Sequence, residues 1–203
     1  AAALNNLALA LDAQGRHGEA IATLGRLIAI QPTNAEAHYN LANALAAEFR
    51  FDAAEASFGQ ALALRPDYGA ALNNLGALQS TRGHHVAAIE SYRRALAVVP
   101  DNAETHYNLA NALVAGNRLD DAVASFRAAI AINPAYAGAH NNLGIVLARL
   151  GQTDAAIACY RRALEIAPNR VDALSNLGNV LAGAQRLDEA IDCYRREIER
   201  AHV

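Results

Sequence analysis

The chain carries AEAHYNLANAL at Ala35–Leu45 and, 68 residues later, AETHYNLANAL at Ala103–Leu113. Between these two segments, and again after the second, related segments share the residues NNLG, at Asn73–Gly76 and Asn141–Gly144. Together they indicate a period of 34 residues, with alternate repeats more alike than neighbours. A fixed period of this size is typical of an array of stacked repeats, each one a small supersecondary unit.

The prolines keep the same period along the whole chain, at Pro32, Pro66, Pro100, Pro134 and Pro168. The six repeats then cover residues 1–34, 35–68, 69–102, 103–136, 137–170 and 171–203. Within each repeat, apolar residues recur at helical spacing over roughly positions 2–14 and 18–30. The proline ends the second stretch, because it cannot continue the hydrogen-bond ladder of a helix. The sequence therefore predicts an all-α chain in which every repeat is a helical hairpin.

Aligned positions of the repeats show how the helices pack. Position 7 is always Leu, position 20 is always Ala, and position 8 is only Ala or Gly. Small side chains on facing helices let two backbones approach closely. Position 24 supplies one large side chain in each repeat, and its members are Leu24, Phe58, Tyr92, Phe126, Tyr160 and Tyr194.

The turn between the two stretches carries residues that tolerate a left-handed backbone, namely Gly15, Gly83, Asn117 and Gly151. An aspartate follows where the second stretch begins, at positions 52, 120, 154 and 188. Aspartate accepts hydrogen bonds from the free N–H groups at a helix start. We therefore expect these aspartates to cap the second helices.

The period, the small residues, the aromatic position and the terminal proline resemble the tetratricopeptide repeat (TPR) family over the whole chain. This resemblance implies a right-handed α-solenoid, a superhelix of antiparallel helix pairs made of six 34-residue TPR units. It also implies that the first helix of each pair lines an inner groove and the second forms the outer face. The chain lacks an initiator Met, so we expect this single solenoid, residues 1–203, to be a fragment of a longer protein.

One polar column is unbroken, and we call it the asparagine ladder: Asn6, Asn40, Asn74, Asn108, Asn142 and Asn176. It lies one residue before the core Leu, so it is expected to point toward the groove. Alternate repeats add a second amide one helical turn later, at Asn43, Asn111 and Asn179. An amide side chain both donates and accepts hydrogen bonds, which suits the backbone of a bound peptide.

Successive repeats should advance by about 8–10 Å, the distance between packed helices. An extended peptide covers this distance in about three residues at ~3.3 Å each. Each ladder asparagine could then meet one peptide group, for about 0.5–1.5 kcal/mol per hydrogen bond. The alternative is structural: the asparagines satisfy helix ends or bridge adjacent repeats. Tyr39 and Tyr107 share a groove-facing column, where ligand stacking and internal packing are both open.

The first helices and the asparagine column are also similar to the repeats that precede the catalytic region in O-linked N-acetylglucosamine transferases and related bacterial proteins. In that family an asparagine at this position holds the backbone of the protein substrate. The resemblance carries over to the ladder residues, and the catalytic region has no counterpart here.

Several other functions are disfavoured. A formal charge of −3 lacks the basic footprint of nucleic-acid binding, and no apolar run approaches the roughly 18–20 residues of a membrane span. The groove columns lack the basic cluster with which some TPR proteins grip C-terminal carboxylates. Glu36, Glu104 and Asp172 are open to two interpretations, tolerance of a basic ligand or acids favoured by the helix dipole. No catalytic motif stands out, so we expect neither an enzyme nor a cofactor.

The histidines of the fourth column, His38, His106 and His140, lie one or two repeats apart and are expected to pack rather than to hold a metal. Cys159 and Cys193 fill a small-residue column, and two reduced thiols favour a cytoplasmic protein. We therefore predict a scaffold that binds an extended segment of a protein or peptide partner through the asparagine ladder. Two alternatives remain, head-to-tail self-association through the terminal repeats and substrate presentation for an attached glycosyltransferase.

Overall fold

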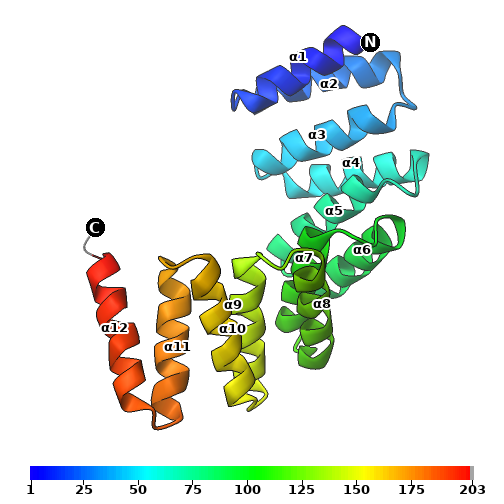
Figure 1. The fold of residues 1–203 in the computed structure, drawn as a ribbon. Helices are drawn as coiled ribbons and strands as arrows, with labels where there is room; N and C mark the ends of the chain where they lie inside the picture. Colours follow the sequence, from blue (N-terminus) through cyan, green and yellow to red (C-terminus); the bar gives the residue numbers. More distant parts are fainter. Residues whose placement is uncertain (202–203) are drawn as a thin grey trace. The chain divides into compact units, whose positions relative to one another are not determined.

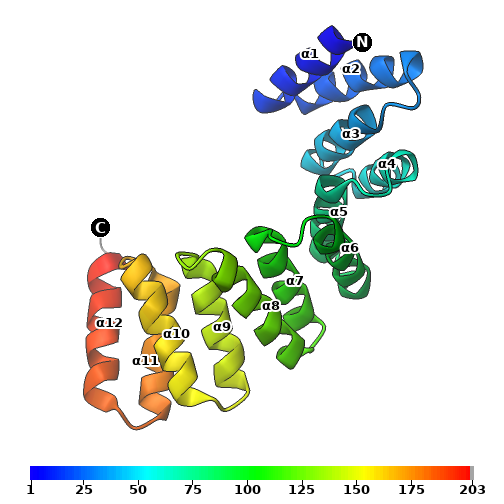
Figure 2. The same ribbon diagram turned by 45° about the vertical axis from the view of Figure 1, so that its right-hand side comes forward.

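The computed structural model describes residues 1–201 as twelve α-helices joined by short turns, with no strand among those residues (Figure 1). The helices are α1 (Ala2–Ala13), α2 (His17–Ile30), α3 (Ala35–Ala47), α4 (Phe51–Leu64), α5 (Gly69–Thr81), α6 (His85–Val98), α7 (Ala103–Ala115), α8 (Leu119–Ile132), α9 (Ala137–Arg149), α10 (Thr153–Ile166), α11 (Val171–Gly183) and α12 (Leu187–Ala201). Each odd-numbered helix pairs antiparallel with the even-numbered helix that follows it (Figures 1 and 2). The predicted all-α array of six helical hairpins is confirmed.

The chain forms two compact units of three hairpins each, which we call the N-terminal half (Ala1–Pro100) and the C-terminal half (Asp101–Val203). In the N-terminal half, α3 also packs on α2, and α5 packs on α4. In the C-terminal half, α9 packs on α8 and α11 packs on α10 in the same way. Each hairpin thus stacks on its neighbour within a half, as stacked repeats require to bury a continuous core.

The turns inside the hairpins have the predicted left-handed residues. Gly15, Gly83 and Gly151 have φ of 73°, 77° and 75°, and Asn117 has φ of 56°. The same position is left-handed in the other two repeats, where Phe49 has φ of 57° and Gln185 has φ of 61°. The stacking of the hairpins therefore imposes this conformation even where the residue does not favour it.

The predicted aspartate caps are wrong. In α4, α8 and α10 the residue before the helix is Arg50, Arg118 or Gln152, and none of them makes a side-chain capping bond. The aspartates instead lie inside the first turn, as Asp52, Asp120 and Asp154 do. There a carboxylate is stabilised by the positive end of the helix dipole without accepting a specific capping bond.

The core follows the predicted columns. The six alanines of position 20 are all buried, as is the large side chain of position 24 in the first five repeats. Position 8 covaries with position 24, since Gly faces Tyr whereas Ala faces Leu or Phe. A Cβ added to Gly76, Gly144 or Gly178 would lie 2.8, 2.6 or 2.6 Å from the ring of Tyr92, Tyr160 or Tyr194. Glycine is therefore required where the larger ring occupies the seam between the two helices.

Across the described part of the chain, residues 1–201, no helix is long and apolar enough to cross a membrane.

Candidate functional site

The asparagine ladder lies on the odd-numbered helices of both halves. Asn6 on α1 is exposed, and the remaining members, Asn40, Asn74, Asn108, Asn142 and Asn176, are half-buried. The second amide column is half-buried at Asn43 and Asn111 and exposed at Asn179. We refer to the surface that carries these two columns, within each half, as the ladder face.

In the N-terminal half, ladder asparagines donate hydrogen bonds to the preceding repeat. Asn74 Nδ2 donates to Tyr39 Oη at 3.1 Å and to Asn43 Oδ1 at 2.9 Å. Asn40 Nδ2 donates to Asn5 Oδ1 at 3.1 Å. These asparagines therefore bridge adjacent repeats, as the structural alternative in the sequence analysis expects.

The C-terminal half repeats this network with nearly the same geometry. Asn142 Nδ2 donates to Tyr107 Oη at 3.0 Å and to Asn111 Oδ1 at 2.9 Å. Asn176 Nδ2 donates to Asn141 Oδ1 at 3.1 Å, and Asn141 is almost fully buried, with 2% of its surface exposed. Two separate halves thus build the same polar network, which indicates that the repeat itself encodes it.

The network leaves particular groups available for a ligand. Within the described residues, Asn43 and Asn111 accept through Oδ1 and make no donor contact through Nδ2. The hydroxyls of Tyr39 and Tyr107 accept from the ladder and likewise donate to no described residue. These amide and hydroxyl hydrogens can bind carbonyl oxygens, so the ladder face offers donors in fixed positions.

Two acids at position 2 of their repeats, Glu36 and Asp172, belong to the same network. Asn5 Nδ2 donates to Glu36 Oε1 at 3.1 Å, and Asn141 Nδ2 donates to Asp172 Oδ2 at 3.3 Å. Glu36 and Asp172 also lie in the first turns of α3 and α11, where the helix dipole favours a carboxylate. Their position is therefore accounted for within the fold, and each keeps further acceptor capacity.

Tyr39 and Tyr107 are half-buried, and each combines ring packing with a hydroxyl that accepts a hydrogen bond from the ladder. The Tyr39 ring lies 5.0 Å from that of Tyr68 and 6.2 Å from that of Phe58. The Tyr107 ring lies 4.9 Å from that of Tyr136. The pKa values of Tyr68 and Tyr136 are raised, first by burial and then by the neighbouring tyrosine. These tilted ring contacts help to hold the side chains of Tyr39 and Tyr107 at the ladder face.

A cavity opens on the ladder face of the N-terminal half, with a volume of about 210 Å³. It lies between α1, α2 and α3 and is lined by Ala8, Leu9, Asp12, Leu24, Tyr39, Asn40 and Asn43. Three of these residues, Tyr39, Asn40 and Asn43, are predicted peptide-binding residues. Part of the predicted site therefore lines a cavity in the surface.

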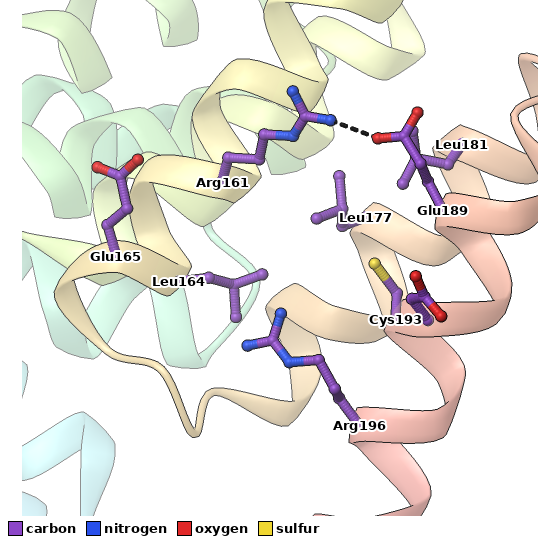
Figure 3. A pocket seen from close by; sticks show the side chains of 9 residues that line it. Arg161, Leu164, Glu165, Leu177, Leu181, Glu189, Cys193 and Arg196 are labelled. Atoms are coloured by element: carbon purple, nitrogen blue, oxygen red, sulfur yellow. Dashed lines mark hydrogen bonds and ion pairs between the residues drawn. The ribbon is translucent and has the colours of Figure 1, made fainter.

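A larger cavity of about 400 Å³ lies in the C-terminal half, and no ladder asparagine is among the residues that line it (Figure 3). Leu164 of α10, Leu177 and Leu181 of α11 and Cys193 of α12 form its apolar part. Its charged rim includes Arg161, which is paired with Glu189 at 2.6 Å. Burial raises the pKa of the Cys193 thiol, so this sulfur is less nucleophilic than an exposed one.

The histidines of the fourth column have structural contacts. His38 Nε2 lies 2.9 Å from the carbonyl oxygen of Pro32, and His140 Nε2 lies 3.1 Å from that of Pro134. Each imidazole thus ties the first helix of a repeat to the turn before it. Among residues 1–201 no cluster of three His, Cys, Asp or Glu side chains could hold a metal ion.

Sequence reasoning missed the partners in the network and four of the seven residues that line the smaller cavity. Asn5 and Asn141 are not among the predicted site residues, and neither are the lining residues Ala8, Leu9, Asp12 and Leu24. The signal is present in the sequence: the bonded columns are 31 or 35 residues apart, one repeat minus three or plus one. Leu24 is also the single non-aromatic residue at position 24.

Known proteins show two kinds of similarity to this chain. Its sequence matches profiles described as tetratricopeptide repeat over residues 33–101, 77–137, 107–171 and 141–202, and a profile described as TPR repeat over residues 8–48. No curated protein sequence matches it.

Several solved structures share the fold. MamA is 26% identical, with a TM-score of 0.78, over 80% of this chain and 95% of that one. YrrB, described as a TPR protein with an unusual peptide-binding site, is 22% identical, with a TM-score of 0.76, over 87% of this chain and 91% of that one. PilF of Pseudomonas aeruginosa is 19% identical, with a TM-score of 0.81, over 94% of this chain and 87% of that one.

Proposed function

The chain belongs to the tetratricopeptide repeat family, and from this premise we propose that it is a scaffold whose ladder faces bind an extended segment of a partner protein. The observation that carries the proposal is the set of available donors at Tyr39, Asn43, Tyr107 and Asn111. Hydrogen bonds from the ladder hold all four side chains in place. A ligand that binds them therefore meets groups whose rotamers are already restricted.

The ligand is a peptide backbone because the available groups match its chemistry. The Nδ2 groups of Asn43 and Asn111 and the hydroxyls of Tyr39 and Tyr107 donate to peptide carbonyl oxygens. Asn40 contributes an acceptor, since its Oδ1 accepts from no described residue and can receive a peptide N–H. The ladder residues thus have two roles. Asn74 and Asn142 position the donor side chains, and the side chains that they hold contact the ligand.

YrrB supports the proposal at the level of the fold. It is described as having a peptide-binding site, and it shares the arrangement of helices at 22% identity. That likeness concerns the fold alone, so the ligand-contacting residues of this chain are argued from its own hydrogen bonds. The free Cys159 and Cys193 are in keeping with a partner met in the cytoplasm.

A peptide-display selection tests the proposal on a variant with Asn43→Asp and Asn111→Asp. Aspartate keeps the oxygen that accepts from Asn74 or Asn142 and replaces the donor amide by a second oxygen. We expect the wild type to enrich extended peptides and the variant to lose them while its thermal unfolding stays close to that of the wild type.

The matched control carries the same two added charges outside the ladder face, as Gln60→Glu and Asn169→Asp, and should enrich the wild-type peptides. The proposal fails if the wild type enriches no peptide. It also fails if the Asn43→Asp, Asn111→Asp variant enriches the same peptides as the wild type.

A second candidate function is head-to-tail self-association, and the exposed apolar side chains of the first and last hairpins favour it. Leu7 on α1 is 49% exposed, whereas Leu143 and Leu177 at the same position are 5% and 4% exposed. On α12, Ile191 is 46% exposed, whereas Ile157 at the same position is 3% exposed. Each terminal hairpin thus presents apolar side chains that a stacked hairpin covers elsewhere in the chain.

A third candidate, which deepens the first, is presentation of a protein substrate to an attached transferase. It rests on the resemblance of the asparagine ladder to the repeats of O-linked N-acetylglucosamine transferases. Sequencing the gene beyond the codon for residue 203 tests it, because a catalytic region must follow in the same reading frame.

A further inference from the structure

The cavity on the ladder face of the N-terminal half lies in the one repeat that departs from the aromatic column. Position 24 is Phe or Tyr in repeats 2 to 6 and Leu24 in the first repeat. In the other repeats a ring fills the seam between the paired helices, and Leu24 fills less of it. The cavity of about 210 Å³ is lined by both seam residues of this repeat, Ala8 and Leu24, and also by Asn40 and Asn43.

The lining of this cavity combines apolar side chains with one carboxylate. Ala8, Leu9 and Leu24 supply the apolar wall, and Leu24 itself is buried, with 1% exposed. Asp12 lines the same cavity one helical turn after Ala8 on α1, with 37% of its side chain exposed. Its Oδ1 lies 2.7 Å from His17 Nδ1, and no described residue contacts Oδ2.

The surroundings of Asp12 favour a cation. Asp12 is the penultimate residue of α1, at the end where the helix dipole is negative. The odd-numbered helices of this half, α1, α3 and α5, contain two acids, Asp12 and Glu36, and no Lys or Arg. The nearest basic residue in the sequence, Arg16, is paired with Glu19 at 2.7 Å. Asn40 Oδ1 adds a neutral acceptor at the rim of the cavity.

We propose that this cavity is a specificity pocket for one basic side chain, Lys or Arg, of the bound peptide; this inference rests on the proposed peptide-binding function. The aliphatic stem lies against Leu9 and Leu24, as long basic side chains do when they cross apolar surface. The charged end meets Asp12 Oδ2 and Asn40 Oδ1 at the rim. The Tyr39 ring, which also lines the cavity, provides a face that attracts a cation.

The volume of the cavity supports a single side chain as its occupant. Pockets for small-molecule ligands usually measure about 300–1,000 Å³, and 210 Å³ falls below that range. The donor amide of Asn43 stands at the rim and can hold the peptide backbone beside the pocket. Backbone binding by the ladder face is independent of ligand sequence, so this pocket sets the position and type of one residue.

The test repeats the peptide-display selection on the wild type, on Leu24→Phe and on Asp12→Asn. Phenylalanine is the native residue at this position in repeats 2 and 4, so Leu24→Phe closes the cavity with a side chain that the hairpin accommodates. Asp12→Asn removes the charge and keeps the shape of the side chain. We expect the wild type to enrich peptides with Lys or Arg at one fixed position, and both variants to enrich peptides without that preference.

Binding of a synthetic peptide, chosen from those that the wild-type protein enriches, then measures the contribution of the basic group alone. Replacement of its basic residue by norleucine, which keeps the stem, should weaken binding to the wild type about tenfold, the usual value of a hydrogen bond to a charged group. The same replacement should leave binding to Asp12→Asn unchanged. Circular dichroism checks that both variants fold, and Gln60→Glu serves as a folded control with an unaltered pocket.

The outcomes separate this inference from the proposed function. If the wild type enriches peptides without a fixed basic position, the pocket proposal is wrong and the scaffold function stands. If the basic position persists in both Leu24→Phe and Asp12→Asn, another part of the surface selects it, and the pocket proposal is again wrong. If no peptide is enriched, both proposals fall together.

Discussion

Two glycines with open space around them should respond to alanine in opposite directions. Gly151 ends the turn after α9 with φ of 75°, and an added Cβ would meet no atom within 4 Å. Gly59 lies in the interior of α4, and its Cβ would also meet nothing. The backbone conformation alone therefore decides the effect. We expect Gly151→Ala to lower the free energy of unfolding by about 1–2 kcal/mol and Gly59→Ala to raise it by about 0.5–1 kcal/mol.

Urea denaturation followed by circular dichroism measures both changes. Because neither substitution creates a contact or a clash, equal effects of the two variants would contradict this account.

The left-handed turn also shows what a sequence can and cannot predict at single residues. Glycine or asparagine marks the turn in four repeats, and there the conformation was predictable. Phe49 and Gln185 adopt it as well, although neither side chain signals it. The aspartate caps failed for a related reason, since the helices begin two residues earlier than a capping aspartate requires. Local chemistry predicts the element, and the stacking of hairpins decides its first residue.

At the scale of the helix pair, positions 8 and 24 meet in the seam between the two helices of a hairpin. In repeats 2 to 6 this pair is either Gly with Tyr or Ala with Phe. The Cβ of an alanine at position 144 would lie 2.6 Å from the Tyr160 ring, so Gly144→Ala forces the ring to move. We expect this variant to lose about 1–3 kcal/mol of stability, the usual cost of overpacking. Adding Tyr160→Phe should restore part of the loss, because the pair Ala110–Phe126 occupies the same seam one repeat earlier.

Thermal unfolding of the two single variants and the double variant forms the double-mutant cycle for this seam. Strictly additive effects would show that the two positions are uncoupled and would contradict the proposed covariation.

The network between adjacent first helices can be tested on one ladder residue. Asn74→Ala removes the two hydrogen bonds that Asn74 donates and the one that it accepts from Asn73, and it leaves the oxygen of Asn43 without its donor, which should cost about 1–3 kcal/mol. Asn6→Ala is the matched control, because Asn6 is exposed and bonds to no described residue, so the change should be neutral or slightly stabilising. Chemical denaturation distinguishes the two, and equal stability of both variants would remove the bridging role from Asn74.

The sequence predicts which positions carry the asparagines of this network, but it predicts few of the hydrogen bonds between them. The period placed the ladder on the first helices and placed Asn43 and Asn111 one turn later. Which asparagine donates and which accepts depends on how far one hairpin is displaced along the next, and the sequence alone does not give that displacement. The cavity is similar: the sequence contains Leu24 where the other repeats have Phe or Tyr, but the position of the cavity beside Asn40 and Asn43 depends on how the hairpins pack.

At the scale of the whole molecule, each half repeats one design: three stacked hairpins, a polar ladder face and an apolar core of alternating small and large side chains. The terminal hairpins differ from the others, because Leu7, Ile191 and Ile198 remain exposed at positions that are buried or half-buried inside the array. A repeat array with such ends can extend by stacking one copy on the next, through a heterologous contact that does not close on itself.

Head-to-tail association therefore makes a prediction that involves both ends at once. The mass of the wild-type chain in light scattering should rise with concentration, because the surface around Leu7 of one copy packs against the surface around Ile191 of another. Either Leu7→Glu or Ile191→Glu should abolish the rise, since a charge at a buried contact is costly and one defective end is enough. An equimolar mixture of the two variants should regain dimers, because each contributes one intact end. Val86→Glu is the control, since Val86 is 84% exposed on α6, outside both terminal hairpins. A constant monomer mass for the wild type at every concentration would exclude the contact and leave the ladder faces as the route to a partner.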